Sequence, residues 1–218
     1  MSLSNSEGRG RRNYTLAVMM RGLRLHRSSM SKAHSKQSKP GFVRIIGGTW
    51  RRHRIAIPAG ANLRPTPDRV RETLFNWLSA KLPGAHCLDL YAGTGVLGFE
   101  ALSRGAARAV MVEHDAGAAE ALEQTRLVLD CDAEIVCVDA REYLQRNDIA
   151  RFDIVFVDPP YSEAVDVILE SILPLLKPGS TVYLERARGE EWPAHAGFDW
   201  SCRASAGGVD YGLASVGT

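Results

Sequence analysis

The sequence has no apolar run approaching the ~18 residues that a membrane-spanning helix needs, so we expect no transmembrane segment. The short apolar run Leu16–Met20 lies too far inside a basic tail to be a secretory signal. The four cysteines include no C-x-x-C pair, and Cys87 and Cys137 lie in apolar runs typical of strands. These absences predict a cytoplasmic protein whose cysteines are reduced core residues.

None of the six histidines lies at a metal-ligand spacing from another histidine, a cysteine or a pair of acids. His114 does stand between Glu113 and Asp115, but this triplet is typical of the polar end of a strand. We therefore expect no metal site. With 45% hydrophobic and 24% charged residues, the chain has the composition of a globular protein with a sizeable core.

Acidic residues are scarce in the first 81 residues, which hold 17 basic side chains and 3 acidic ones, a net charge of +14. The other 137 residues hold 10 basic and 22 acidic side chains, a net charge of −12. Such an asymmetry is typical of a basic segment that faces a polyanion, attached to a body with a different task.

Three segments follow from the pattern along the chain. Residues 1–40 are rich in Ser, Arg, Lys and Gly without periodicity and predict a basic, disordered arm. Residues 41–81 predict a hairpin, with strands at Val43–Ile46 and Ile55–Ile57, followed by a helix with Thr66 as N-cap and Pro67 at its first position. Residues 82–218 then form the main body.

Apolar strands alternate with helical segments in this body, which predicts an α/β fold with a parallel, doubly wound sheet covered by helices on both faces. We expect strands at His86–Leu90, Ala109–Glu113, Glu134–Val138, Phe152–Asp158 and Thr181–Glu185. We expect helices at Val96–Arg104, Ala116–Leu129, Arg141–Arg146 and Ala164–Leu176. The Gly-rich segment Phe198–Val216 is a candidate for a closing antiparallel hairpin.

A glycine-rich turn follows the first of these strands. Gly93, Gly95 and Gly98 match G-x-G-x-x-G, a pattern shared with dinucleotide sites. Asp89, four residues before Gly93, is placed to hold a cationic amino group, which favours S-adenosylmethionine over a pyrophosphate. The next strand ends at Glu113, where a carboxylate can bind ribose hydroxyls. Asp139 and Ala140 follow the third strand, where an acid and a backbone amide can read adenine.

The segment Asp158-Pro159-Pro160-Tyr161 follows the fourth strand. Two consecutive prolines cannot continue a strand, so this segment must leave the sheet as a rigid loop at its carboxyl edge. Asp158 and the Pro159 carbonyl offer two acceptors for the hydrogens of an exocyclic amine, and Tyr161 offers a stacking face. This arrangement would direct the nitrogen lone pair toward a sulfonium methyl group.

The sequence resembles the RsmD-type methyltransferases, which methylate the exocyclic N2 of a guanine in 16S ribosomal RNA. The resemblance covers nearly everything from Arg44 to Glu185. It rests on the blocks Arg44–Arg51, Leu63–Leu78, Asp89–Gly98, Glu100–Arg104 and Val155–Tyr161. The first two blocks are the more specific, because D-P-P-Y is shared by other amino-group methyltransferases. The extension 1–40 and the tail after Glu190 depart from the family pattern.

This resemblance implies a Rossmann-like class I methyltransferase core, with a seven-stranded, mostly parallel sheet, an antiparallel C-terminal strand and a small N-terminal hairpin that contacts RNA. It implies S-adenosyl-L-methionine as cofactor, held by Asp89, Gly93, Gly95, Glu113 and Asp139. Catalysis is expected at Asp158, Pro159, Pro160 and Tyr161. The implied substrate is 16S rRNA, of the guanine 966 type, within an assembling 30S subunit, and the protein is expected to be a monomer.

The scarcity of acids near the hairpin indicates that its arginines bind RNA. These are Arg44, Arg51, Arg52, Arg54 and Arg64. Trp50 is either an RNA platform or, in the reading we favour, a core residue that anchors the hairpin; Thr66 and Arg71 are candidates for the cofactor's carboxylate. Alternative functions are a DNA adenine-N6 methyltransferase, a protein-glutamine methyltransferase and a non-catalytic RNA-binding or assembly protein.

Overall fold

The computed structural model describes residues 41–57, 66–146, 151–160, 162–195 and 197–217. All of them lie within one compact unit, Ser38–Thr218. Within the described residues, no helix combines the length and apolar character needed to cross a membrane.

The chain enters this unit through a short hairpin and a helix. Strand β1 (Phe42–Arg44) pairs antiparallel with β2 (Arg54–Ala56), and α1 (Asp68–Trp77) follows. The predicted Thr66 cap is wrong: the helix begins one residue later, Pro67 occupies the N-cap with an extended backbone, and no side chain caps it. Thr66 is instead 5% exposed.

A seven-stranded sheet forms the centre of the unit, with the order β5-β4-β3-β6-β7-β9-β8. The first five strands in this order are parallel, and β9 runs antiparallel to both of its neighbours. The strands are β3 (His86–Asp89), β4 (Arg108–Glu113), β5 (Ala133–Cys137), β6 (Phe152–Val157), β7 (Leu176–Ala187), β8 (Phe198–Ala206) and β9 (Val209–Val216). The predicted parallel sheet with one reversed C-terminal strand is therefore confirmed.

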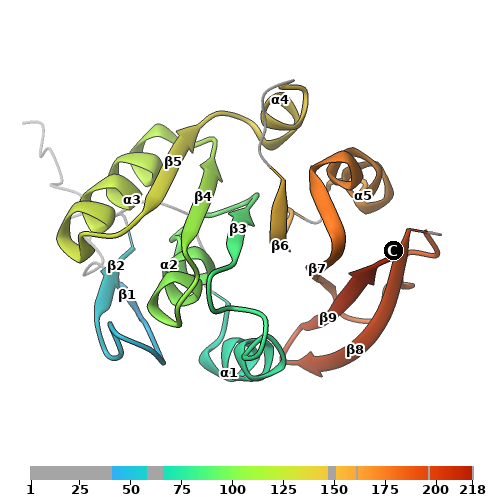
Figure 1. Ribbon diagram of the computed structural model, residues 1–218, viewed down its shortest axis with the longest axis horizontal. Helices are drawn as coiled ribbons and strands as arrows, with labels where there is room; N and C mark the ends of the chain where they lie inside the picture. Colours follow the sequence, from blue (N-terminus) through green and yellow to red (C-terminus); the bar gives the residue numbers. More distant parts are fainter. Residues whose placement is uncertain (1–40, 58–65, 147–150, 161, 196, 218) are drawn as a thin grey trace, which may run out of the picture. The chain divides into compact units, whose positions relative to one another are not determined.

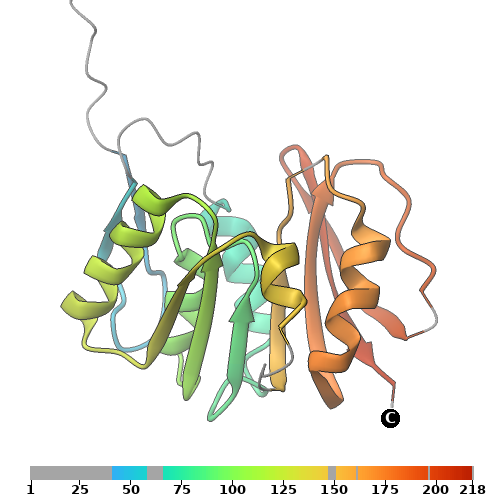
Figure 2. The ribbon, with the colours of Figure 1, turned by 90° about the horizontal axis from the view of Figure 1, so that it is seen from above.

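Helices cover both faces of this sheet (Figures 1 and 2). Successive residues of a strand point to opposite faces. In β6, Ile154 and Phe156 therefore join one apolar cluster and Val155 and Val157 the other. The first cluster includes α1, α2 (Val96–Ser103) and α3 (Ala116–Leu129); the second includes α4 (Ala140–Leu144) and α5 (Val165–Ile172). This double covering explains why the central strands are apolar without alternation.

The hairpin belongs to the first of these layers. Val43, Ile45 and Ile55 are at most 6% exposed and belong to the same apolar cluster as α1 and α2. In Figure 1 the hairpin, drawn in blue, lies beside α2. The helix that links the glycine turn to the sheet therefore also supports the basic hairpin.

Two expectations from the sequence are wrong, one about the length of the helix before β7 and one about a cysteine at the end of β5. The helix predicted to reach Leu176 ends at Ile172, a short 3-10 turn (Leu173–Leu175) containing Pro174 follows, and β7 begins at Leu176. Proline lacks the amide hydrogen that an α-helix interior requires, which accounts for the early end. Cys137 was expected in the core but is exposed at the end of β5, whereas Cys87 is buried as predicted.

Candidate active site

Carboxylates meet at the carboxyl edge of the parallel strands. Asp89 ends β3, Glu113 ends β4, and Asp158 comes directly after β6. Since β3 lies between β4 and β6 in the sheet, the strand order reverses here, which is where open α/β sheets bind ligands. Asp89 and Glu113 are 2% and 6% exposed, so their charges lie largely out of water.

The glycine turn after β3 is held in place by these two carboxylates. Gly93 donates its amide hydrogen to Glu113 Oε2 over 2.8 Å, and Gly98 donates to Asp89 Oδ2 over 3.1 Å. Gly95 is the N-cap of α2 with φ +72°, and a Cβ there would overlap Leu122 Cδ2. Only glycine fits this position without strain, so the turn brings bare backbone to the edge of the sheet.

Burial makes the charge on Asp89 costly. Desolvation raises the pKa of Asp89 to about 7, the amide of Gly98 lowers it, and the neighbouring charge of Glu113 raises it further. A cation placed against Asp89 would reverse this cost, because an opposite charge favours the ionised form. The chemistry of the site therefore suits a positively charged ligand.

Asp139 and Ala140 lie at the start of α4, after β5. Asp139 is the N-cap of this helix: its Oδ1 accepts the amide hydrogen of Arg141 over 2.8 Å. Asp139 is exposed and Ala140 is buried. Tyr91, in the glycine turn, feels the negative charges of Glu163 and Asp139 and has a raised pKa, mainly because of burial. Asp139 thus lies near the same turn.

Asp158 leaves the sheet as predicted, followed by buried Pro159 and exposed Pro160, while Tyr161 lies outside the described residues. Burial raises the pKa of Asp158 to about 8, and the charges of Glu185 and Asp89 raise it further. The structure therefore brings Asp158 close enough to Asp89 for their charges to interact. In the described part of the chain, no group of three or more His, Cys, Asp or Glu side chains is arranged to hold a metal ion.

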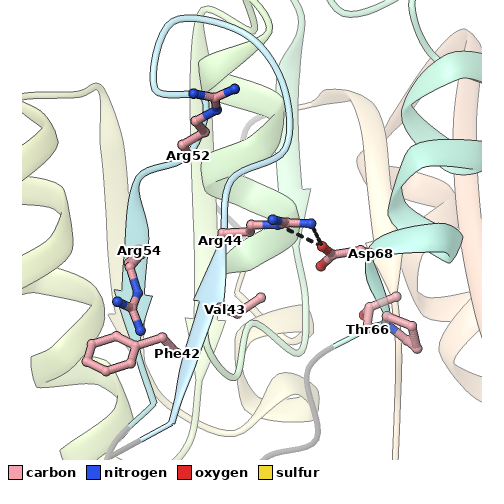
Figure 3. A pocket seen from close by; sticks show the side chains of 8 residues that line it. Phe42, Val43, Arg44, Arg52, Arg54, Thr66 and Asp68 are labelled. Carbon is pink, nitrogen blue, oxygen red and sulfur yellow. Dashed lines mark hydrogen bonds and ion pairs between the residues drawn. The ribbon is translucent and has the colours of Figure 1, made fainter.

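Arginines of the hairpin form a second candidate site, around an open cavity of about 600 Å³ (Figure 3). Arg44, Arg52 and Arg54 line it together with Phe42 and Asp68, among others. The guanidinium of Arg54 lies 4.1 Å from the centre of the Phe42 ring. Arg44 pairs with Asp68 at 2.8 Å, so one of the three cations is partly neutralised. Arg51 is exposed, and Arg64 lies outside the described residues.

A buried ionic cluster fastens the hairpin to α2. Glu100, 0% exposed, accepts the amide hydrogens of Ile46 and Gly47 over 2.7 and 2.8 Å and pairs with Arg104 at 2.7 Å. Buried Arg71 also reaches Glu100, at 3.4 Å. Because each buried charge in the cluster has a partner, the cluster holds the hairpin in a fixed position against α2.

Two further expectations concern residues around this cluster. Arg71 was a candidate for the cofactor's carboxylate, but its guanidinium nitrogens are bound to the Thr66 and Arg44 carbonyls, Asp68 and Glu100. That expectation is wrong for Arg71, which joins the hairpin to α1. Trp50 is partly buried and packs against the apolar core, which agrees with the anchoring role we favoured for it.

Comparison with known proteins places the chain in a family. A family model described as "Conserved hypothetical protein 95" matches residues 43–211. The chain is 43% identical to ribosomal RNA small subunit methyltransferase D of Escherichia coli K12 over 141 residues, 64% of this chain and 69% of that protein. It is 39% identical to the protein of the same name from Haemophilus influenzae, over 72% of this chain and 84% of that protein. The chain belongs to the ribosomal RNA small subunit methyltransferase D family.

Solved structures agree with this assignment. The Escherichia coli protein yhhF matches with a TM-score of 0.71 and 37% identity, covering 82% of this chain and 99% of that chain. The Thermus thermophilus 16S rRNA N2 G1207 methyltransferase RsmC, solved with AdoMet and guanosine, has a TM-score of 0.61 at 22% identity, over 82% of this chain and 50% of that one. The second likeness shows the fold, which is that of class I methyltransferases.

Two residues of the site in this family member were not singled out from the sequence. Glu100 is the only acid in the otherwise apolar and small helix Val96–Ser103, and a lone charge in such a helix signals a buried ion pair. Glu185 follows Tyr183 by two residues in an apolar strand, which places both on one face. Both sequence patterns could be noticed, but neither identifies the residues that contact Glu100 or Glu185 until the fold is known.

Proposed function

We propose that this protein is an S-adenosylmethionine-dependent ribosomal RNA methyltransferase that modifies the exocyclic N2 of a guanine in 16S rRNA, of the guanine 966 type. The observation that carries this proposal is the Asp158-Pro159 segment at the carboxyl end of β6, beside the glycine turn, in a member of this family. Substrate in the form of an assembling 30S subunit and a monomeric, cytoplasmic enzyme without a metal are parts of the same proposal.

The residues at the edge of the sheet fit the cofactor. Gly93 and Gly95 offer backbone without side chains, and Asp89 offers a buried carboxylate whose charge is unfavourable without a cation. Glu113 would bind the ribose hydroxyls through lone pairs that remain beside its bonds to Gly93 and Asp115. Asp139 and the amide of Ala140 would contact the adenine.

S-adenosylmethionine supplies an electrophilic methyl group on a positively charged sulfur. The chain's own task is to hold the guanine amine in line with it. Asp158 and the carbonyl of Pro159 accept the two amine hydrogens, and Tyr161 stacks on the base. With the cofactor bound, this placement would direct the nitrogen lone pair of the amine at the methyl group that the sulfonium supplies. The surplus proton leaves to Asp158 or water.

The ionisation of Asp158 connects this chemistry to pH. Burial and the charges of Glu185 and Asp89 raise the pKa of Asp158, which favours its protonated form in the free protein. A positive charge nearby lowers the pKa of a carboxyl group. Cofactor binding therefore favours the ionised form of Asp158, which is the better acceptor for the amine.

In the proposed function, the hairpin provides the surface that binds RNA. Arg51, Arg52 and Arg54 are exposed, and in Figure 3 Arg52 lies on the loop that joins the two strands while Arg54 lies over Phe42. Guanidinium groups bind phosphates in pairs of hydrogen bonds. Replacing Arg52 and Arg54 together by Ala should weaken RNA binding and flatten its salt dependence, whereas an unchanged slope would contradict an RNA-docking hairpin.

One assay tests the function. Transfer of a labelled methyl group is measured with under-modified small ribosomal subunits, naked 16S rRNA and duplex DNA, followed by identification of the modified nucleotide. We expect N2-methylguanine in rRNA. Methyladenine in DNA, methylglutamine in protein or the absence of transfer would each replace the proposal with one of the alternatives.

The role of Asp158 is tested in the same assay. Asp158→Ala should reduce methyl transfer by at least about 100-fold and leave the affinity for S-adenosylmethionine within about three-fold of wild type. Asp89→Ala is the matched variant, because it should weaken the cofactor affinity instead. Wild-type turnover in Asp158→Ala would contradict the assignment.

A further inference from the structure

Glu185 lies beside Asp158 on the next strand of the sheet. Leu184 of β7 is in register with Val157 of β6, so the residues that follow them, Glu185 and Asp158, are neighbours at the carboxyl edge. Phe156 and Tyr183, two residues before Asp158 and Glu185, pack edge to face with ring centres 6.3 Å apart. Because side chains alternate along a strand, Asp158 and Glu185 project to the same face as these rings.

The Glu185 carboxylate is buried and held in a defined position. Its side chain is only 6% exposed, and the Tyr183 hydroxyl donates a hydrogen bond to Glu185 Oε2 over 2.9 Å. The negative charge of Glu185 reaches Asp158, where it adds to the effect of burial. A second carboxylate held beside Asp158 at the carboxyl edge of the sheet needs a chemical reason, because acidic groups with perturbed pKa values cluster at sites that bind ligands.

The pattern of donors on nucleobases suggests that reason. Guanine presents two kinds of donor side by side, the N1 hydrogen and the 2-amino group. Adenine and cytosine each present an amino group beside a ring nitrogen that is an acceptor. Two adjacent carboxylates therefore match the edge of guanine, whereas they would face a lone pair of adenine or cytosine with another lone pair. A buried polar group left unpaired by the wrong ligand gives strong discrimination.

We propose that Glu185 accepts the N1 hydrogen of the target guanine while Asp158 holds its 2-amino group, so that Glu185 selects guanine over the other amino-bearing bases. This inference rests on the proposed function and extends it, because it names the residue that reads the base. The Tyr183 hydroxyl positions the Glu185 carboxylate for this contact.

The experiment uses an rRNA substrate in which 2-aminopurine replaces the target guanine. This base keeps the 2-amino group but has a lone pair at N1 and no O6. The full-length wild-type protein should methylate the guanine substrate at least about 100-fold faster than the 2-aminopurine substrate. Wild-type rates within about three-fold of each other would overturn the inference without any variant.

The variant Glu185→Gln sharpens the test. Its side-chain amide can donate a hydrogen bond to the N1 lone pair of 2-aminopurine. The ratio of the methylation rate with guanine to the rate with 2-aminopurine should therefore decrease by at least about ten-fold, however much the absolute rates fall. The ratio of the two RNAs' equilibrium dissociation constants, measured without turnover, should narrow in the same direction. Far-ultraviolet circular dichroism checks that the variant is folded.

Tyr183→Phe is the matched control, because it removes the same hydrogen bond to Glu185 while leaving the carboxylate in place. We expect it to lower the rate but to keep the wild-type preference for guanine. Equal ratios in wild type, Glu185→Gln and Tyr183→Phe would mean that Glu185 only supports the fold. Failure of the wild-type protein to methylate any guanine would instead contradict the proposed function itself.

Discussion

At the scale of single residues, the charges of Asp89 and Asp158 are unfavourable in the free protein, because burial raises the pKa of both carboxyl groups. Asp89 and Glu185 are nearly inaccessible to water, and the charges of Asp89 and Glu185 both raise the pKa of Asp158. Groups with perturbed pKa values of this kind cluster at functional sites. In the proposed reaction, a cationic cofactor and an amine-bearing base would bind against these carboxylates.

These carboxylates give the first prediction, on the pH dependence of stability. The folded-state pKa values of Asp89 and Asp158, about 7 and about 8, lie above those of the unfolded chain, so the folded state binds more protons. Their contribution to stability is therefore complete below the unfolded pKa of 3.8, falls progressively above it, and is lost once the pH has risen through about 7 and about 8. We expect the unfolding free energy of the ligand-free protein to fall by more than about 1 kcal/mol between pH 6 and pH 9.

Urea unfolding at the two pH values measures this difference. Asp158→Asn should reduce the loss, because it removes one of the responsible protons, and Asp199→Asn, at an exposed carboxyl, should not change it. Parallel stability curves for wild type and Asp158→Asn would show that Asp158 does not titrate in this range.

Residue identity in the site could be predicted only where a local pattern specifies it. Asp89 and Asp158 could be proposed because each lies at the end of a strand in a recognisable string, and Gly95 because it belongs to the glycine pattern before α2. Glu185 was missed because its significance depends on a register between β6 and β7 that no local pattern contains. Cys137 was misplaced because an apolar run does not say how much of a strand's end its neighbours cover.

At the scale of elements, the contact between the hairpin and α2 depends on a glycine. Gly48 has φ +75°, and a Cβ there would overlap the carbonyl oxygen of Ser103, the last residue of α2. The neighbouring amides of Thr49 and Trp50 donate to the Ser103 carbonyl and hydroxyl over 2.7 and 2.9 Å. The turn therefore lies directly against the end of the helix, where no side chain fits.

This contact gives the second prediction. Gly48→Ala combines an unfavourable backbone conformation with a clash against backbone, so it should destabilise the protein by roughly 2 kcal/mol or more. Gly84 has the same φ of +75° with no atom near its absent Cβ, so Gly84→Ala should cost only about 1 kcal/mol. Urea unfolding compares the two variants, and equal losses would mean that the close contact with Ser103 contributes nothing.

Most elements could be predicted from the sequence, because apolar runs and their spacing fix where strands and helices must lie. The lengths of β7, β8 and β9 could not, since β7 extends from Leu176 to Ala187 only through pairing with β6 on one side and β9 on the other. The buried cluster around Glu100 was hidden for the same reason: apart from Arg104, four residues on, the partners of Glu100 lie 29 to 54 residues away in the sequence.

At the scale of the whole molecule, the uneven charge divides between segments with different predicted tasks. Residues 1–40 hold nine of the 17 basic side chains that precede residue 82, and the division into arm, hairpin region and core stays a prediction. The arginines of the hairpin, by contrast, stand on a firmly packed support. Distant positive charge accelerates encounter with RNA, whereas placement of the base depends on packed residues.

The third prediction follows from this division. Deleting residues 1–40 should slow association with RNA and reduce its salt dependence, because nine cations are removed. Single-turnover methyl transfer at saturating RNA should stay within about three-fold of the full chain. Stopped-flow binding at two salt concentrations and a rapid-quench assay measure both quantities. A ten-fold loss at saturating RNA would instead give the arm a part in the reaction.

Helix α2 begins at the glycine turn and ends against Gly48, so its eight residues, about 12 Å in length, connect the two places that bind ligand in the proposed reaction. A rigid element shared in this way can couple the two binding equilibria. By thermodynamic reciprocity, whatever factor the methyl donor adds to the affinity for RNA, RNA must add to the affinity for the methyl donor. The released by-product, which lacks the positive charge, would then loosen the hold on RNA and assist turnover.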